Sequence, residues 1–169
     1  MSNTLIVYFS REGENIVHEE IKNINIGNTE KLAKIIASVT NGQLLKLEPV
    51  KPYSLNYDEC NLRAKEEYEK NIRPEFNKVL ENLDAYDTIY LGFPIWYRTF
   101  PRIIKTFLET YDLSNKVVKP FSTNEEGDFG LAELELRSSL KNSDLRKGLS
   151  IRGYDVDNSL DAVKKWIEK

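Results

Sequence analysis

Two flat aromatic side chains, Trp96 and Tyr97, follow Pro94 and Ile95 in a segment that has the chemistry to hold a planar ring. Proline cannot donate a hydrogen bond to a sheet, so a strand that precedes this segment should end near Pro94. An aromatic pair beside a proline is most often part of a core or an interface. Loops usually stay at the surface, however, and we therefore do not expect both rings to be buried.

A second group of residues could bind an anion. Ser10 ends an apolar segment, and Gly27, Asn28 and Thr29 come at the start of an expected helix. Hydroxyl groups and free backbone N–H groups at a helix N-terminus attract negative charge, and the helix dipole adds to the attraction. The alternative is that Asn28 and Thr29 only cap the helix. The glycine spacing fits neither the Walker A motif nor the dinucleotide-binding motif.

A third polar segment runs from Ser122 to Gly130 and contains Glu125, Glu126 and Asp128. Taken alone it is a loop. It becomes informative because all three segments follow expected strands, and the carboxyl ends of parallel strands meet at one edge of a sheet. In open α/β sheets ligands bind at that edge. There, the third segment can supply polar partners to the edge of a ring bound against the aromatic segment.

The elements that must position these segments alternate between strand and helix. Strands are expected at 4–9, 43–47, 88–93, 116–121 and 147–151. Two helices are expected to begin at 28–29 and at Pro101, and two more to cover 131–140 and 159–167. Residues 57–70 are charged with sparse apolar positions, and the charge run from Arg63 to Lys70 is most simply a solvated helix face. Phe76, Val79, Leu80 and Leu83 indicate a further helical stripe. Residues 10–27 are expected to form a long polar loop. This alternation predicts a three-layer α/β sandwich with a five-stranded parallel sheet.

Length and charge narrow the function. The 169 residues fit one domain, 1–169, with a formal net charge of −3 and interspersed acidic and basic residues. This composition excludes a basic field for nucleic acid and predicts no membrane insertion. The single cysteine, Cys60, excludes an internal disulfide, and together with the absence of a recognisable signal peptide it favours the cytoplasm. His18 has no second histidine or nearby cysteine with which to form a metal site, so we expect it in a surface loop.

Several motifs in this order resemble the flavodoxin-like FMN-binding family. They are Tyr8-Phe-Ser-Arg11, Gly27-Asn-Thr29, Gly92-Phe-Pro-Ile-Trp-Tyr97 and the 122–130 loop, and together they span nearly the whole chain. The family's phosphate loop is usually compact, whereas residues 12–26 form an insertion here. The resemblance implies FMN as the cofactor and the strand order 2-1-3-4-5.

The resemblance also implies a role for each segment. Ser10 and Thr29 would bind the FMN phosphate with the backbone around Gly27 and Asn28, assisted by Arg11, and with Asn15 as a further contact. Pro94, Ile95, Trp96 and Tyr97 would cover one side of the isoalloxazine, and Thr123, Asn124, Glu125 and Gly127 would lie along its other edge. The resemblance implies no metal and no catalytic side chain, since the flavin itself performs the redox chemistry.

Three functions remain open at this point. The first is an electron-transfer flavodoxin that serves redox partner proteins. The second is an FMN-dependent NAD(P)H:quinone-type oxidoreductase that reduces a small-molecule electron acceptor, and the third is a scaffold that has lost FMN. Glu125, Glu126 and Asp128 favour a low potential, while Arg98 opposes it. Abundant one-electron-reduced flavin would indicate the first function, rapid reduction by NAD(P)H the second, and failure to bind FMN the third.

Overall fold

The computed structural model describes residues 3–169. Its strands are β1 (Thr4–Tyr8), β2 (Gly13–Val17), β3 (Glu20–Ile24), β4 (Gln43–Lys46), β5 (Thr88–Pro94), β6 (Val117–Asn124), β7 (Asp144–Leu145) and β8 (Leu149–Arg152). Its α-helices are α1 (Asn28–Thr40), α2 (Tyr57–Glu69), α3 (Arg102–Thr110), α4 (Ala132–Ser139) and α5 (Leu160–Ile167), with a 3-10 helix, η1 (Gly153–Asn158), before α5.

The central sheet is parallel and has the order β4-β1-β5-β6, with β7 and β8 both paired to the far side of β6. This arrangement confirms the predicted order 2-1-3-4-5. The difference is that two short strands share the fifth position, β7 beside the start of β6 and β8 beside its end. The apolar residues of β1 are buried on both faces, as expected of a central strand in a parallel sheet.

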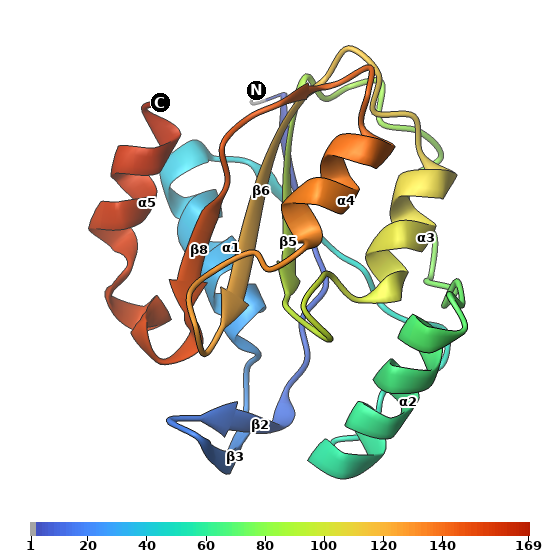
Figure 1. Ribbon diagram of the computed structural model, residues 1–169. Helices are drawn as coiled ribbons and strands as arrows, with labels where there is room; N and C mark the ends of the chain where they lie inside the picture. The colour runs from blue at the N-terminus through green and yellow to red at the C-terminus, as the bar shows by residue number, and fades with distance from the viewer. Residues whose placement is uncertain (1–2) are drawn as a thin grey trace.

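Helices cover both faces of the sheet and make three layers (Figure 1). α1 and α5 lie on one face, where Leu32, Ile36, Val163 and Trp166 join Ile6 in one buried cluster. α3 and α4 lie on the other face. There Ile103, Ile104, Phe107, Ala132 and Leu136 belong to a second, larger cluster. The fold therefore holds the carboxyl ends of the strands rigidly between two packed helical layers.

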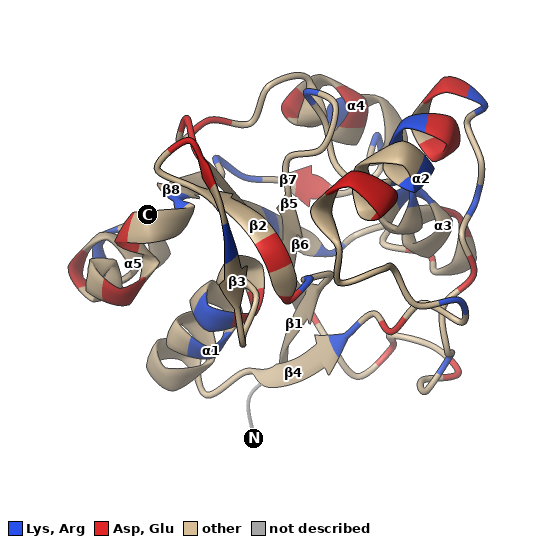
Figure 2. Ribbon diagram, turned by 90° about the horizontal axis from the view of Figure 1, so that it is seen from below, with Lys and Arg blue, Asp and Glu red and all other residues tan. Residues whose placement is uncertain are grey.

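Residues 10–27 contain a β-hairpin, so the prediction of a polar loop was wrong here. β2 and β3 pair with each other in antiparallel fashion and form a separate two-stranded sheet. Their sequences mix polar and apolar residues without a clean alternation, because most of their side chains are at least partly exposed. Viewed from below in Figure 2, the hairpin extends across the sheet edge between the α1 and α2 sides of the molecule.

The helix expected around Phe76 and Leu83 is also absent from the structure, which has irregular backbone there. The backbone of this segment bonds to the chain near residues 48–50 instead of to itself. Val50 N–H donates to the Glu75 carbonyl, and Asn77 N–H donates to the Glu48 carbonyl. Leu83 is buried and Phe76 packs against the core, whereas Val79 is exposed, so the apolar spacing here marks neither a helix nor a continuous buried stripe.

Two other boundaries differ in ways that affect the site. β6 continues to Asn124, so Thr123 and Asn124 belong to the end of a strand and not to the loop predicted from Ser122. α1 begins after Gly27, and neither Asn28 nor Thr29 acts as its N-cap. α1 ends at Asn41, whose φ of 56° is the left-handed conformation typical of a helix C-terminus. Among residues 3–169, no helix has the length and apolar character that crossing a membrane requires.

Candidate functional site

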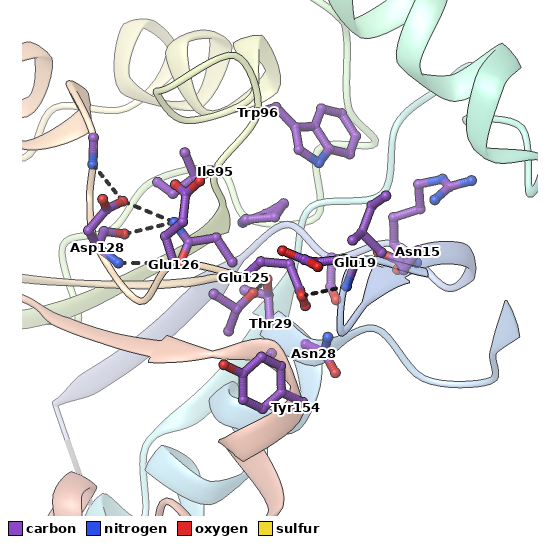
Figure 3. Close-up of a pocket in the computed structure, with 18 of the residues that line it drawn as sticks. Asn15, Glu19, Asn28, Thr29, Ile95, Trp96, Glu125, Glu126, Asp128 and Tyr154 are labelled. Atoms are coloured by element: carbon purple, nitrogen blue, oxygen red, sulfur yellow. Dashed lines mark hydrogen bonds between the residues drawn. The ribbon is translucent and has the colours of Figure 1, made fainter. Parts of the chain in front are cut away.

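A pocket of about 1000 Å³ lies at the carboxyl edge of the sheet (Figure 3). The segments after β1, β5 and β6 all contribute to it, as expected from the parallel sheet. The predicted site residues that line it are Ser10, Arg11, Asn15, Asn28, Thr29, Pro94, Ile95, Trp96, Thr123, Asn124 and Glu125. Three other predicted residues, Gly27, Tyr97 and Gly127, are not part of its lining.

One wall of the pocket is the start of α1. Ser10 Oγ accepts a hydrogen bond of 3.0 Å from Glu30 N–H and thus takes the place of a side-chain cap. Within residues 3–169 no hydrogen bond engages the N–H groups of Asn28 and Thr29. A Cβ on Gly27 would lie 2.1 Å from Ser10 Oγ, so glycine is needed to bring the two segments together. The result is a helix N-terminus with free donors that face a pocket.

Thr29 and Thr123 join the first wall to the end of β6. Their hydroxyl oxygens lie 2.8 Å apart, and both residues are buried. In such a pair one hydroxyl donates and the other remains free to donate to a third group. The pair therefore presents a polar group at the floor of the pocket.

The Arg11 guanidinium is bound by backbone carbonyls. It donates to the Ser54 carbonyl at 2.9 and 2.7 Å and to the Asn56 carbonyl at 3.2 Å. Arg11 therefore anchors the segment before α2, and this role occupies the donors that an anion would need. Asn15 is likewise engaged within its own segment, since its amide donates to the carbonyls of Arg11 and Gly13 at 3.3 Å each.

Trp96 forms part of the opposite wall. Its ring meets Phe9 at 84° and 5.3 Å and Tyr53 at 76° and 5.2 Å, both edge-to-face arrangements. Trp96 is half-buried and lines the pocket. These contacts fix the indole on the core while part of it remains accessible to a ligand.

Tyr97 and Arg98 occupy a tight turn between Trp96 and Thr99. Trp96 and Thr99 exchange backbone hydrogen bonds of 2.8 and 3.2 Å, and both central residues have positive φ, 52° for Tyr97 and 68° for Arg98. Such turns normally favour glycine or asparagine, so two other residues here indicate stored strain. The turn sends Tyr97 away from the pocket, where its hydroxyl donates to Asn61 Oδ1 at 2.7 Å. Arg98 lines the pocket instead.

Asn124 organises the loop after β6. Its Oδ1 accepts from Gly127 N–H at 2.6 Å, and its Nδ2 donates to Asp128 Oδ1 at 3.0 Å. These bonds form an Asx-type turn that gives the loop a defined shape. Gly127, with φ of 74°, supplies the left-handed residue that this turn needs. Glu125, Glu126 and Asp128 are thereby held along the pocket.

Ion pairs support the helix start from outside. Burial alone would raise the pKa of Glu30, but hydrogen bonds and charge interactions with Lys34 and Lys46 outweigh it and hold that pKa below its ordinary value. Both pairs are close, at 2.9 Å for Lys34 and 3.0 Å for Lys46. Glu30 therefore favours its ionised form, paired with both lysines.

Sequence reasoning missed several lining residues. Ile16, His18 and Glu19 come from the unpredicted hairpin, and Gly153 and Tyr154 follow β8. A signal existed for Tyr154, because the segment after a fifth parallel strand reaches the same sheet edge. Tyr57 also lines the pocket, as do Glu126, Asp128 and Gly130 of the loop that the sequence already placed beside it. No group of acidic, cysteine or histidine side chains within residues 3–169 has the arrangement of a metal site.

The sequence pattern of the flavodoxin family matches residues 22–169, and the chain belongs to this family. None of the curated proteins compared with the sequence matches it. Solved structures, in contrast, are similar to this chain. A protein of Bacteroides uniformis, provisionally assigned as a flavoprotein, is 33% identical with a TM-score of 0.80, covering 99% of each chain. A second such protein, from Bacteroides eggerthii, is 26% identical with a TM-score of 0.73, covering 97% of this chain and 99% of the other.

A third similar structure is a Lactobacillus acidophilus flavoprotein in complex with FMN. It is 21% identical, with a TM-score of 0.68 and coverage of 99% of both chains, and at this identity it supports the fold alone. Membership of the flavodoxin family supports FMN as the cofactor. The residues present fit this group, because free N–H donors, two hydroxyls and a half-buried indole line one pocket.

Proposed function

We propose that this protein binds one FMN in the pocket and acts as an electron-transfer flavodoxin. The observation that carries the proposal is the convergence of an anion-binding helix start, an aromatic wall and a polar loop in one pocket at the sheet edge. Bound FMN would accept and release electrons. The chain's own residues would bind, orient and tune it.

Each wall would then have its own task. The N–H groups of Asn28 and Thr29, with the hydroxyls of Ser10 and Thr29, would hold the phosphate. Pro94, Ile95 and Trp96 would cover one side of the ring, and the segment from Thr123 to Gly127 would border its polar edge. Arg11 would shape the site by fixing the segment before α2, and Tyr97 would hold the turn against α2.

The charges along the pocket favour a low potential. Four carboxylates line it, those of Glu19, Glu125, Glu126 and Asp128. Arg98 also lines it, and its guanidinium, unlike that of Arg11, is not bound by backbone carbonyls within residues 3–169. Carboxylates repel the negative charge that a bound ring gains on reduction and so lower its reduction potential. The positive charge of Arg98 raises that potential. The balance supports an electron donor. We place its work in the cytoplasm, with redox proteins as partners, and we propose no nucleic acid or membrane among them.

The second candidate is an FMN-dependent NAD(P)H:quinone-type oxidoreductase. The size of the pocket favours it, because about 1000 Å³ is at the upper end of the roughly 300–1,000 Å³ usual for ligand sites and leaves room for a small-molecule electron acceptor beside a cofactor. Tyr57 and Ile16 line part of that space.

A binding titration tests the shared basis of both candidates. We expect FMN to bind with a stoichiometry of one, and riboflavin to bind more weakly because it lacks the phosphate. Equal affinity for FMN and riboflavin would contradict the assignment of the α1 N-terminus. A protein that binds neither would contradict both candidates and leave the third function, a scaffold for protein contacts.

A further inference from the structure

The β2–β3 hairpin forms one side of the pocket through Asn15, Ile16, His18 and Glu19. Within residues 3–169 its strands pair only with each other and not with the central sheet. The residues of β3 are exposed along almost its entire length. An isolated two-stranded hairpin is at best marginally stable in water. Its position therefore depends on the contacts at its base and at its tip.

The base of the hairpin is fixed to the segment that leads into α2. Glu14 N–H donates to the Leu55 carbonyl at 2.8 Å, and the Glu14 carboxylate accepts from Tyr57 N–H at 2.7 Å. Gly13, with φ of 94°, allows a close approach, since a Cβ there would lie 2.7 Å from the Leu55 carbonyl oxygen. This end is a hinge held by one bond between backbone groups and one from a backbone N–H to a side-chain carboxylate.

The tip reaches the opposite side of the pocket. The His18 ring stacks on the Tyr154 ring with centroids 4.0 Å apart and an angle of 24°. Glu19 N–H donates to the Glu125 carboxylate at 3.3 Å, a bond drawn in Figure 3. These two contacts connect the hairpin to η1 and to the loop after β6, more than a hundred residues further along the chain.

The tip contacts are weaker than those at the base. His18 and Glu19 are exposed, and both have positive φ, 52° and 64°, which strains residues other than glycine. The tip is thus held by one aromatic stack and one long hydrogen bond. A hairpin with a firm base and a weakly held tip can swing away from the pocket while the sheet stays intact.

We propose that the β2–β3 hairpin is a strap across the cofactor site, latched by the stacking of His18 on Tyr154, and that release of this latch controls how fast FMN leaves. The proposal rests on FMN binding in the pocket. His18 and Tyr154 act as latch residues, and they need not touch the cofactor to do so. Opening the tip widens the pocket toward solvent, and closing it buries the bound group.

The test measures the rate at which FMN fluorescence recovers when loaded protein is rapidly diluted. Removing the stack with His18→Ala or Tyr154→Ala should speed FMN release by about three- to tenfold, the effect of losing one aromatic pair. The double variant should release FMN no faster than the faster single variant, because both changes break the same contact. Tyr154→Phe keeps the stacked ring and should release FMN more slowly than Tyr154→Ala.

A second measurement closes the strap covalently. In a Cys60→Ser background, Glu19→Cys and Glu125→Cys are joined by a short reagent that links two thiols. The linked protein should release FMN at least tenfold more slowly than the same variant before linking. Cleaving the linker should restore the rate.

Unchanged release in the His18 and Tyr154 variants, or in the linked protein, would overturn the strap while leaving FMN binding intact. Additive effects in the double variant would overturn the latch role of the stack. Wild-type protein that does not bind FMN would overturn the strap together with the proposed function.

Discussion

The hydroxyl oxygens of Thr29 and Thr123 lie 2.8 Å apart, although 94 residues separate them in the sequence. This contact ties the start of α1 to the end of β6, and so fixes the helix N-terminus at the pocket relative to the loop that carries the pocket's carboxylates. In the proposed FMN complex, the two threonines would couple the position of the phosphate to that of the ring.

Removing the Thr29 hydroxyl should weaken FMN binding selectively. Thr29→Val keeps the shape of the side chain, and we expect a loss of about 1.5–3 kcal/mol for FMN, as for a hydrogen bond to a charged group. Riboflavin affinity should change little, since it carries no phosphate. Thr110→Val is the matched control, because Thr110 bonds only to its own helix. Equal losses for FMN and riboflavin would contradict this role.

Shortening Trp96 should weaken binding of the ring. Trp96→Ala should cost FMN and riboflavin alike about 1–3 kcal/mol if the indole stacks on the ring as aromatic residues do on nucleic acid bases. Trp96→Phe should recover part of this loss. Trp166→Phe, in the core between α5 and the sheet, serves as the control and should lower stability without changing affinity for folded protein. An unchanged affinity in Trp96→Ala would place the indole outside the ring site.

Glycine at position 98 should stabilise the protein without ligand. Arg98 has φ of 68°, and glycine adopts this conformation without strain. We expect Arg98→Gly to raise the free energy of unfolding by about 0.5–1 kcal/mol in urea titrations. Arg137→Gly, in the last turn of α4, should instead lower it, because glycine is unfavourable in a helix and the ion pair with Glu133 is lost. A loss of stability at position 98 would show that the turn is not strained.

Neutralising a pocket carboxylate should raise the flavin potential. Glu126→Gln removes a negative charge that opposes reduction, and a charge about 8 Å away in water contributes on the order of 20 mV. The control is Glu133→Gln, since Glu133 pairs with Arg137 on the surface of α4 and does not line the pocket. Potentials measured against reference dyes report the difference. A lower potential in Glu126→Gln would contradict the electrostatic account.

Stability should depend on the ionisation of Glu30 in acid. Its pKa in the folded protein is lowered, so folding favours the carboxylate. The contribution is therefore fully present above a pH of about 4.5, the ordinary value, and is lost as the pH falls through the lower folded pKa. Glu30→Gln should be destabilised by up to about 1 kcal/mol at pH 7 and by less at pH 3. Equal destabilisation at both values would contradict this assignment.

The sequence predicted the sheet well because its strands are short apolar runs that end at prolines or polar loops. It also located the three pocket segments, since the order of parallel strands determines where their carboxyl ends meet. It failed where tertiary contacts decide the conformation. The hairpin lacks alternation and depends on Leu55 and Tyr154, while the apolar residues around Phe76 pack without a helix.

The side-chain directions within the pocket were the least predictable feature. Arg11 had the charge to bind a phosphate, but carbonyls after β4 bind its guanidinium. Tyr97 and Trp96 are adjacent, yet a turn with two residues at positive φ sends them to different sites. Neither outcome follows from local spacing, because each depends on a partner more than 30 residues away.

The central claim, an FMN electron carrier, is tested most directly by an anaerobic spectral titration of the FMN-loaded protein. Excess NADH or NADPH is added first and dithionite second. We expect the flavin spectrum to remain oxidised with the nicotinamides and then to change in two resolved one-electron stages with dithionite. Prompt bleaching by either nicotinamide, without a resolved intermediate stage, would contradict the carrier and identify the reductase.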